Sequence, residues 1–467
     1  MKRKLLSDAL NEISDRHIAQ ASRRTKRVYR FAAMAAMLAL VILTLSVTQP
    51  LVLRARAISQ ASAPRLSAVP RYDDYDDRTE YQQAHTQWQT ERETREQNAS
   101  EALVALTPFF TAASLEFLGG SDANTLWSPA NASIGLAMLT ELAAGNTQAQ
   151  LLELLGAQDT DTLRRHTSAL WESVYYKDGQ EVSTLANSLW LDSGMEYEEA
   201  AVDALSYHYY ASVYRGDLGS SAVNKSIGSW LNSNTGGLLK SAADSIRLPK
   251  DAVLALYSTL YIQSKWGSEF NAAKNTKATF HAPSGDRNAT YMNKPLLQTN
   301  YYWGDTYGAV SLRLKNGCQM WFILPDEGLT PTEVLRDGQY MDMLTDAQWE
   351  QEKYMKVNLS VPKFDVSQAR DLKDGLRKLG VTDLFSLESA DFSAITSASP
   401  VFITAANQAV RVQVDEQGVK AAAYIEFPGA GAAAPPEEII DFVLDRPFLF
   451  VLTNDGIPLI TGVVNEP

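Results

Sequence analysis

Residues 253–270 read VLALYSTLYIQSKWGSEF, and the first twelve form a nearly continuous apolar run. Such a run is typical of a strand that is buried on both faces of a sheet. Further strand-like runs follow at residues 318–325, 356–366, 409–414 and 448–453. Segments with a helical period precede the run, at residues 102–118, 132–143, 147–155 and 160–176. We therefore expect one large α+β domain over residues 102–467.

The first hundred residues differ from that domain in composition. Residues 1–30 carry nine Lys or Arg against three Asp or Glu, and we expect a short basic cytoplasmic segment. Residues 31–53 hold no charge over 23 positions, enough for one transmembrane helix or signal anchor. Residues 54–101 are too polar to bury a core and predict a stalk, helical from about Glu80. A cleaved signal peptide, cut near residue 57 or 63, is the alternative.

Charge and cysteine content bear on partners and location. The formal net charge is −13, and the basic leader leaves the remainder strongly acidic. An acidic surface argues against nucleic acid as a partner, because phosphate binding needs clustered Lys and Arg. Cys318 is the lone cysteine, which excludes an intramolecular disulfide. We expect a monomer at the cell membrane, single-pass, with its N-terminus cytoplasmic and its domain extracellular, or a secreted domain if the leader is cleaved.

A search for enzyme chemistry returns no active site. The five histidines have no metal-ligand spacing, so we expect neither a metal nor a cofactor. Ser360 and Lys363 have the spacing of a Ser–Lys nucleophile, but that chemistry needs a helical turn and the alternation here is that of a strand. The chain is therefore expected not to be an enzyme, and a binding or inhibitory role is favoured.

Eight separated segments together resemble the serpin family. They are NTLWSPANASIGLAML (124–139), AGNTQAQLLELLG (144–156), ANSLWL (186–191), SKWGSEF (264–270), VPKFDV (361–366), LGVTDLF (379–385), DRPFLFVL (445–452) and GVVNEP (462–467). Each is weak evidence alone, whereas their order along residues 102–467 is highly specific. The resemblance implies a serpin fold with about nine helices, three β-sheets and an exposed reactive-centre loop. We interpret the chain as a membrane-anchored, bacterial member.

By the same resemblance, VDEQGVKAAA (414–423) is the serpin hinge. Its residues are Glu416, Gly418, Val419, Ala421, Ala422 and Ala423. In the family, a protease cuts the loop beyond the hinge and forms an acyl-enzyme, and the loop then enters the central sheet as a new strand and distorts the protease. Every second residue in 419–427 is apolar, as such a strand requires. This favours an inhibitor over a non-inhibitory serpin acting as a binding or scaffold module. An anchored hydrolase is the third hypothesis.

The resemblance also implies a scissile bond. Counting from the hinge glycine places it between Ala432 and Ala433, and Gly431 and Ala434 mark neighbouring alternatives. Ala or Gly precedes each of these bonds, so the expected targets are elastase-like or subtilisin-like serine proteases with a small specificity pocket. Residues 421–445 contain no Lys or Arg, so trypsin-like enzymes are expected to be poor targets.

The sheet-opening region of the family maps onto four residues of this chain. Ser128, from the Ser-Pro pair, also suits the start of a helix, and Trp266, at the top of the sheet, also suits core packing. Ser258 and Gln408 stand where the family usually has Asn and His. We expect these two side chains to form a buried pair that satisfies its own hydrogen bonds.

Overall fold

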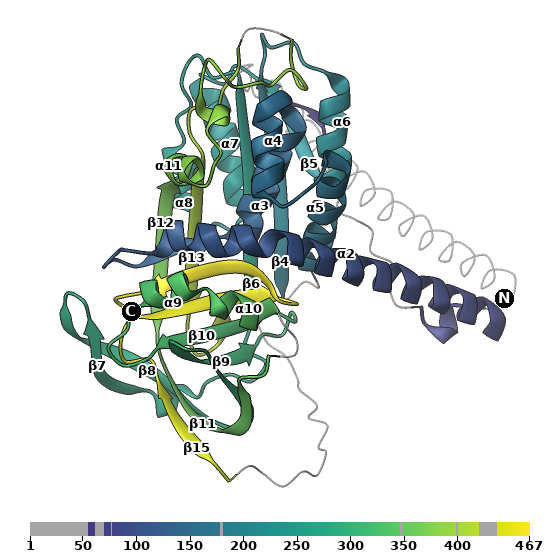
Figure 1. The fold of residues 1–467 in the computed structure, drawn as a ribbon. Helices are drawn as coiled ribbons and strands as arrows, with labels where there is room; N and C mark the ends of the chain where they lie inside the picture. The colour runs from purple at the N-terminus through teal and green to yellow at the C-terminus, as the bar shows by residue number, and fades with distance from the viewer. Residues whose placement is uncertain are drawn as a thin grey trace, which may run out of the picture. The chain divides into compact units, whose positions relative to one another are not determined.

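The computed structural model describes residues 55–60, 70–75, 77–177, 181–345, 349–397, 400–419 and 437–467. Within these residues the chain forms ten α-helices and three hydrogen-bonded sheets (Figure 1). The predicted α+β class, with about nine helices and three sheets, is confirmed. The predicted cytoplasmic segment and transmembrane helix, residues 1–53, lie outside the described residues.

Seven of these helices precede the central apolar strand. Their bounds are α2 (Arg78–Leu118), α3 (Pro129–Leu142), α4 (Gly145–Leu154), α5 (Thr160–Val174), α6 (Glu199–His208), α7 (Ser221–Asn234) and α8 (Lys240–Ser245). Three short helices follow, namely α9 (Pro331–Asp337), α10 (Gln339–Thr345) and α11 (Lys373–Lys378). The helical first half that the sequence predicts is therefore observed.

The first sheet contains the apolar run as its strand β6. In spatial order its strands are β1 (Arg56–Ser59), β5 (Ala211–Gly216), β4 (Val182–Asp192), β6 (Leu254–Lys265) and β14 (Gly418–Val419), with β3 (Tyr176–Lys177) paired to β4. β6 lies antiparallel to β4 over ten consecutive residue pairs. Two further strands, β12 (Phe364–Asp371) and β13 (Asn407–Val414), pair only with each other among the described strands.

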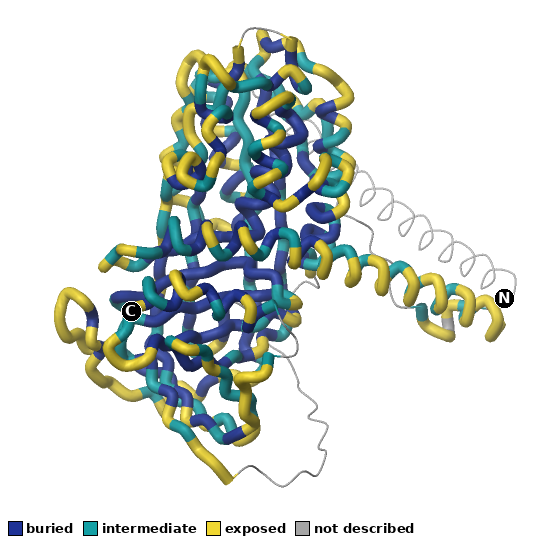
Figure 2. Tube along the Cα trace, viewed as in Figure 1, coloured by how far each residue is buried: buried dark blue, intermediate teal, exposed yellow. Residues whose placement is uncertain are grey.

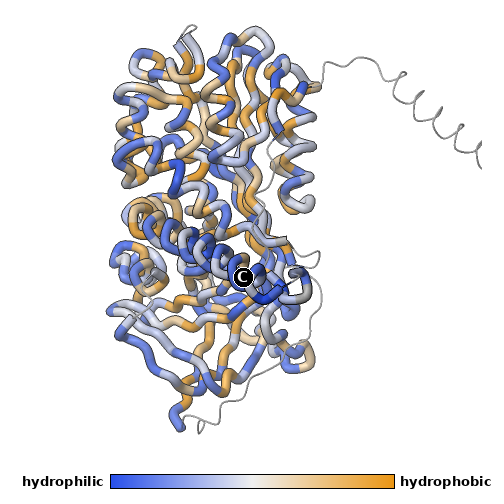
Figure 3. The backbone as a smooth tube through the Cα atoms, turned by 90° about the vertical axis from the view of Figure 1, so that its right-hand side faces the viewer, coloured by the Kyte–Doolittle hydropathy of each residue, from blue (hydrophilic) through white to orange (hydrophobic). Residues whose placement is uncertain are grey.

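The second sheet forms much of the core. Its order is β15 (Ile439–Val443), β11 (Glu352–Pro362), β8 (Gly285–Trp303), β9 (Tyr307–Arg313), β10 (Gln319–Pro325), β16 (Phe448–Asn454), β17 (Ile457–Val464) and β2 (Thr125–Trp127), and β7 (Thr276–Ala282) pairs with β8. All residues of β17 and all but the last of β16 are buried (Figure 2). Hydrophobic residues run along these interior strands (Figure 3). The C-terminal strands are therefore a main source of apolar burial.

Helix α2 extends well beyond the helix predicted at residues 102–118. It begins at Arg78, because the Asp77 side chain accepts hydrogen bonds from the backbone N–H groups of Thr79 and Glu80. Its buried residues all lie from Ala102 onward. In the described part of the chain, α2 alone passes the length and composition test for a membrane span, and half of its apolar window is buried in the domain. That burial is typical of a core helix.

The predicted stalk contributes a strand to the first sheet. Residues 56–59 form β1, which pairs antiparallel with β5 through Arg56–Arg215, Ala57–Tyr214 and Ser59–Val213. Four residues with one apolar alternation carry too little pattern to predict a strand against a polar background. The predicted domain limits remain a prediction, to which the structure adds this contact between residues 56–59 and the sheet.

Candidate functional site: a slot between two strand edges

The first sheet has an open slot beside β6. β4 pairs with one edge of β6 along residues 254–263, whereas β14 is the one described strand on the other edge and reaches only Ser264 and Lys265. The free edge of β13 and the free edge of β6 line a cavity of about 420 Å³. A second cavity of about 610 Å³ is lined by residues 254–258 and 400–408. Because free strand edges present unpaired N–H and C=O groups, this slot is suited to receive a further strand.

A chain of polar side chains lies beside the slot. Asn131 Nδ2 of α3 donates to Ser258 Oγ at 2.8 Å, and Ser258 Oγ donates to Asn187 Oδ1 at 2.7 Å. Asn187 Nδ2 in turn donates to the Tyr209 carbonyl at 2.7 Å. These bonds join α3, β6, β4 and the residue after α6. Since each member has a partner, the network can be buried without orphaned polar groups.

Gln408 bonds to the start of α3 from the other side of the slot. Its Oε1 accepts from the Ser128 backbone N–H at 2.9 Å, and its Nε2 donates to the Ser128 carbonyl at 3.0 Å. Ser128 Oγ donates to the Leu459 carbonyl at 2.6 Å, so Ser128 begins α3 without capping it. The predicted Ser258–Gln408 hydrogen bond is wrong for the described structure: each side chain has other partners, because the slot separates their strands.

The first hinge residues are paired with the C-terminal end of β6. Gly418 lies opposite Lys265 and Val419 opposite Ser264, and Val419 is only 5% exposed. A Cβ at residue 418 would come within 2.4 Å of Lys265 Cα and 2.5 Å of the Ser264 carbonyl oxygen, and the φ there is +152°. Glycine is therefore required for this close approach of the two backbones.

Trp266 holds the residues that precede this pair. It is fully buried, and its Nε1 donates to the Asp415 carbonyl at 2.8 Å. Its backbone N–H donates to the Gln417 carbonyl at 3.1 Å. Trp266 thus packs in the core and contacts the hinge, and its role in sheet opening stays a prediction.

Glu416 forms the polar anchor of the hinge. Its carboxylate accepts from Lys363 Nζ at 2.8 Å and from Asn275 Nδ2 at 2.5 Å. Burial acts to raise the pKa of Glu416, but these hydrogen bonds and the Lys363 charge outweigh it and hold the pKa below its usual value. Ser360 Oγ donates elsewhere, to Asn293 Oδ1, which agrees with the rejection of a Ser360–Lys363 nucleophile pair.

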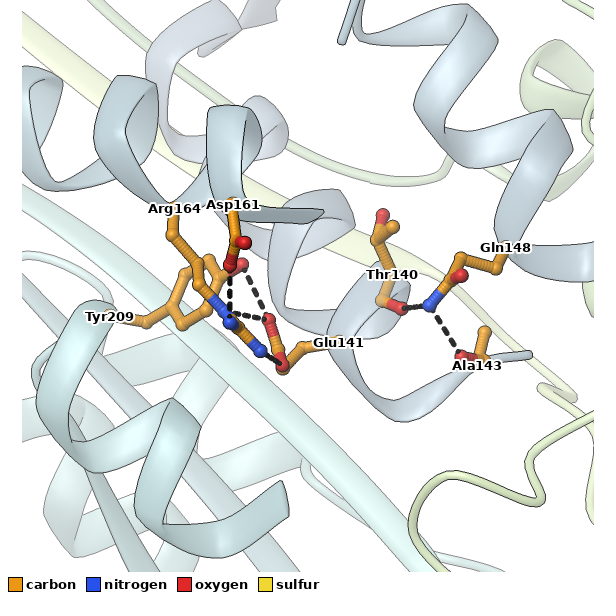
Figure 4. A network of polar contacts seen from close by, with 7 residues as sticks. All are labelled: Thr140, Glu141, Ala143, Gln148, Asp161, Arg164 and Tyr209. Atoms are coloured by element: carbon orange, nitrogen blue, oxygen red, sulfur yellow. Dashed lines mark hydrogen bonds and ion pairs between the residues drawn. The ribbon is translucent and has the colours of Figure 1, made fainter. Parts of the chain in front are cut away.

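A largely buried ion pair braces α3 against α5 (Figure 4). Arg164 of α5 forms a bidentate pair with Glu141 of α3 and also binds Asp161 at 2.7 Å. Tyr209 Oη donates to Glu141 at 3.2 Å. Burial and the neighbouring carboxylate raise the pKa of Tyr209 well above its usual value, so it remains a donor. Since the Tyr209 carbonyl accepts from Asn187, this residue connects the brace to the network at the slot.

The structure brings together some of the predicted site residues and leaves others undescribed. Ser128, Ser258 and Gln408 line the slot. Glu416, Gly418 and Val419 form the described part of the hinge, which pairs with β6 and contacts Trp266. Hinge residues Ala421, Ala422 and Ala423 and the predicted scissile residues Gly431, Ala432, Ala433 and Ala434 lie outside the described residues. Sequence reasoning missed the partners Asn131, Asn187, Lys363 and Asn275, whose roles depend on contacts between distant segments.

Metal ligation and cysteine chemistry have no candidate group in the described part of the chain. No three His, Cys, Asp or Glu residues of the described ranges are placed to hold a metal ion. Cys318 is buried, and burial raises the pKa of its thiol to about 12, so it is protonated and unreactive. The described fold is an α+β protein with a slot beside the free edge of β6.

Comparison with known proteins specifies that class further. A family model described as serpin (serine protease inhibitor) matches residues 110–467. Mouse neuroserpin is 27% identical over 371 residues, which cover 74% of this chain and 87% of that protein. The native-state structure of the thermophilic serpin tengpin matches with a TM-score of 0.71 at 20% identity, covering 89% of this chain and all of that one. A structure of thyroxine-binding globulin in complex with thyroxine matches with a TM-score of 0.63 at 21% identity, covering 78% of this chain and 98% of that one.

The chain belongs to the serpin family. Serpins are generally protease inhibitors rather than enzymes, and as a family they bind serine proteases. Some family members have other roles, as the thyroxine complex of thyroxine-binding globulin illustrates.

Proposed function

We propose that this serpin inhibits serine proteases of elastase-like or subtilisin-like specificity, as a suicide substrate whose cut loop fills the slot. The observation that carries the proposal is the hinge, because Gly418 and Val419 already occupy the first two positions on the free edge of β6. The next ten positions of that edge, residues 254–263, have no described partner on the slot side.

The register of β14 predicts which residues a longer strand would place together. Continuing it puts Ala421 opposite Ile262, Ala423 opposite Leu260, Ile425 opposite Ser258 and Phe427 opposite Leu256. Directly opposed residues share a face of an antiparallel sheet. Ile262, Leu260 and Leu256 pack against the main core, so the apolar residues of the loop would enter that core. The polar set from Lys420 to Glu426 would take the opposite face.

A denaturing gel tests this mechanism. The full-length chain, purified in mild detergent, is incubated with pancreatic elastase or with subtilisin. We expect a covalent complex heavier than either component, and none with protease whose active serine is blocked. Cleavage without a complex would instead support a non-inhibitory binding or scaffold role, as in thyroxine-binding globulin.

The variant Val419→Arg tests insertion itself. A charge at this position would have to be buried beside Ser264, where Val419 is now 5% exposed. We expect cleavage to continue while the yield of covalent complex falls at least tenfold. Val104→Arg, at an exposed position on α2, is the control, and complex formation by Val419→Arg at the normal rate refutes the insertion mechanism.

We also propose that the protein is a bacterial, single-pass monomer held at the cell membrane by residues 31–53, with its domain extracellular. The pairing of β1 with β5 supports an intact N-terminal region. Cleavage near residue 57 would cut β1 in two, and cleavage near residue 63 would remove it from the mature chain. Recovery of the intact chain in washed membranes is expected, and a mature N-terminus near residue 58 or 64 would contradict the anchor.

A further inference from the structure

Three large apolar side chains are exposed together on one face of the second sheet. Leu297 of β8 is 65% exposed, Tyr354 of β11 is 52% exposed and Ile439 of β15 is 58% exposed. The three strands are neighbours at one end of the sheet (Figure 1). Burying large apolar side chains is favourable, so a group of them left in solvent indicates an interaction surface.

The strand registers place these side chains on one face. Lys356 lies opposite Ile439 in the parallel β11–β15 pair. Between Met355–Thr299 and Val357–Leu296 the β8–β11 register shifts by one residue, so Leu297 and its neighbour together oppose Lys356.

The direction of that face follows from the buried neighbours. Met355 and Val357 are buried, so Lys356 between them points to the outer face. Leu297 and Ile439 flank Lys356 there, and Tyr354, two residues before Lys356, also points outward. The shift is a β-bulge, a feature that redirects side chains and is frequent beside functional sites.

Polar groups share this face with the apolar row. Asn358 Nδ2 donates to Asp441 at 2.8 Å, and Lys356 lies between Leu297 and Ile439. Apolar side chains interspersed with polar groups are usual in a protein–protein interface.

We propose that the row of Leu297, Tyr354 and Ile439 contacts the body of the protease that attacks the loop. This inference rests on the proposed function and adds a determinant of target choice outside the loop. Its basis is the reach of the chain. The predicted cut lies just before Ala433, which is six residues from Ile439. The Cα atoms of Ala433 and Ile439 are therefore at most about 20–22 Å apart.

The size of a protease makes that reach decisive. A globular protease of about 230 residues has a radius of gyration of about 17 Å, and its surface extends farther. An enzyme engaged at the predicted bond is therefore within reach of the β8–β11–β15 face. Targets with apolar side chains beside the active-site cleft would gain contacts that a short peptide substrate cannot offer.

The test compares two double variants of the full-length chain. Leu297→Ala with Tyr354→Ala removes two side chains of the row and leaves Ile439, which is nearest the loop, unchanged. Leu387→Ala with Tyr207→Ala removes one exposed leucine and one exposed tyrosine that lie elsewhere on the chain. Circular dichroism melting checks that both variants are folded. A synthetic peptide of residues 425–438 checks that each protease preparation is active.

The readouts are the second-order rate of covalent complex formation and the stoichiometry of inhibition, with pancreatic elastase and with subtilisin. We expect the row variant to react about tenfold more slowly with at least one protease, as loss of an interface hot spot would produce. Its stoichiometry and the control variant's rate should not change. Unchanged rates with both proteases overturn this inference alone.

The failure of the proposed function has a different signature. If the unmodified chain is cut without forming a complex, the rate of cutting becomes the readout. Slower cutting of the row variant then supports the protease contact while refuting the insertion mechanism. Equal cutting of both variants refutes both proposals.

Discussion

Replacing Gly418 by alanine should release the hinge from the sheet. The new Cβ would lie 2.4 Å from Lys265 Cα and 2.5 Å from the Ser264 carbonyl oxygen, and both contacts are with backbone atoms that cannot rotate away. The backbone conformation at this residue, with φ of +152°, also disfavours any side chain. We therefore expect β14 to detach from β6.

The magnitude follows from the contacts that β14 makes. Detachment exposes Val419, which is 5% exposed in the structure, at about 1.5–3 kcal/mol for the loss of its burial. Loss of about two backbone hydrogen bonds to β6 adds about 1 kcal/mol each. The free energy of unfolding should thus fall by roughly 3–5 kcal/mol. At about 2 °C per kcal/mol for a domain of this size, the melting temperature should fall by roughly 6–10 °C.

Thermal melting, followed by circular dichroism and by tryptophan fluorescence, measures this change. The fluorescence reports on the hinge because Trp266 Nε1 donates to the Asp415 carbonyl. Gly135→Ala is the control: nothing lies within 4 Å of its added Cβ, and alanine favours a helix. If Gly418→Ala melts with the wild-type chain and its fluorescence is unchanged, the hinge is not paired with β6 as described.

Two further substitutions test the ion pairs near the slot. The pKa of Glu416 is lowered in the folded protein, so its contribution to stability is present above the ordinary glutamate pKa and is lost as the pH falls through the lowered value. Melting temperatures of the wild type should therefore approach those of Glu416→Gln in the acid range, and a constant difference at all pH values would contradict the role of the Lys363 contact. Arg164→Met leaves Glu141 buried without its partner and should cost about 3–5 kcal/mol in urea unfolding, whereas Arg92→Met, in an exposed pair, should cost under about 1 kcal/mol. Equal costs for the two arginines would refute the assignment of a buried brace.

The sequence predicts those features of the slot that depend on local pattern. The nearly continuous apolar run at residues 253–264 predicts a strand, and it forms β6. The alternation after Gly418 follows the period of two along a strand, and its first residue, Val419, pairs with the edge of β6. The serpin resemblance added the positions of Gln408 and Trp266. Gln408 lines the slot, and Trp266 follows the C-terminal end of β6 and contacts the hinge.

Contacts between distant segments could not be predicted in the same way. The expected Ser258–Gln408 bond assumed that the two strands are neighbours, but a slot separates them and each side chain bonds to α3 or β4 instead. The Lys363–Glu416 pair joins residues 53 positions apart, and no periodicity connects them. β1 was missed because four residues carry too short a pattern to stand out in a polar segment.

The dimensions of the slot constrain where a productive cut can fall. In the β14 register, residues 420–429 match the ten free positions of β6, which span about 33 Å. The C-terminal end of β6 meets the second sheet through the Trp266–Leu314 bridge, and β15 belongs to that sheet. In this register Gly429 would lie opposite Leu254, at the end of the slot away from Lys265. From there the eight Cα steps to residue 437 reach at most about 29 Å. An intact loop therefore cannot fill the slot while β15 stays in place, whereas a cut after Gly429 removes this constraint.

The predicted bond between Ala432 and Ala433 lies after Gly429 and leaves three residues, about 10 Å, between the filled slot and the bound enzyme. A protease that cuts before Gly429 would leave too short a strand, so we expect that enzyme to cleave the chain and to escape active.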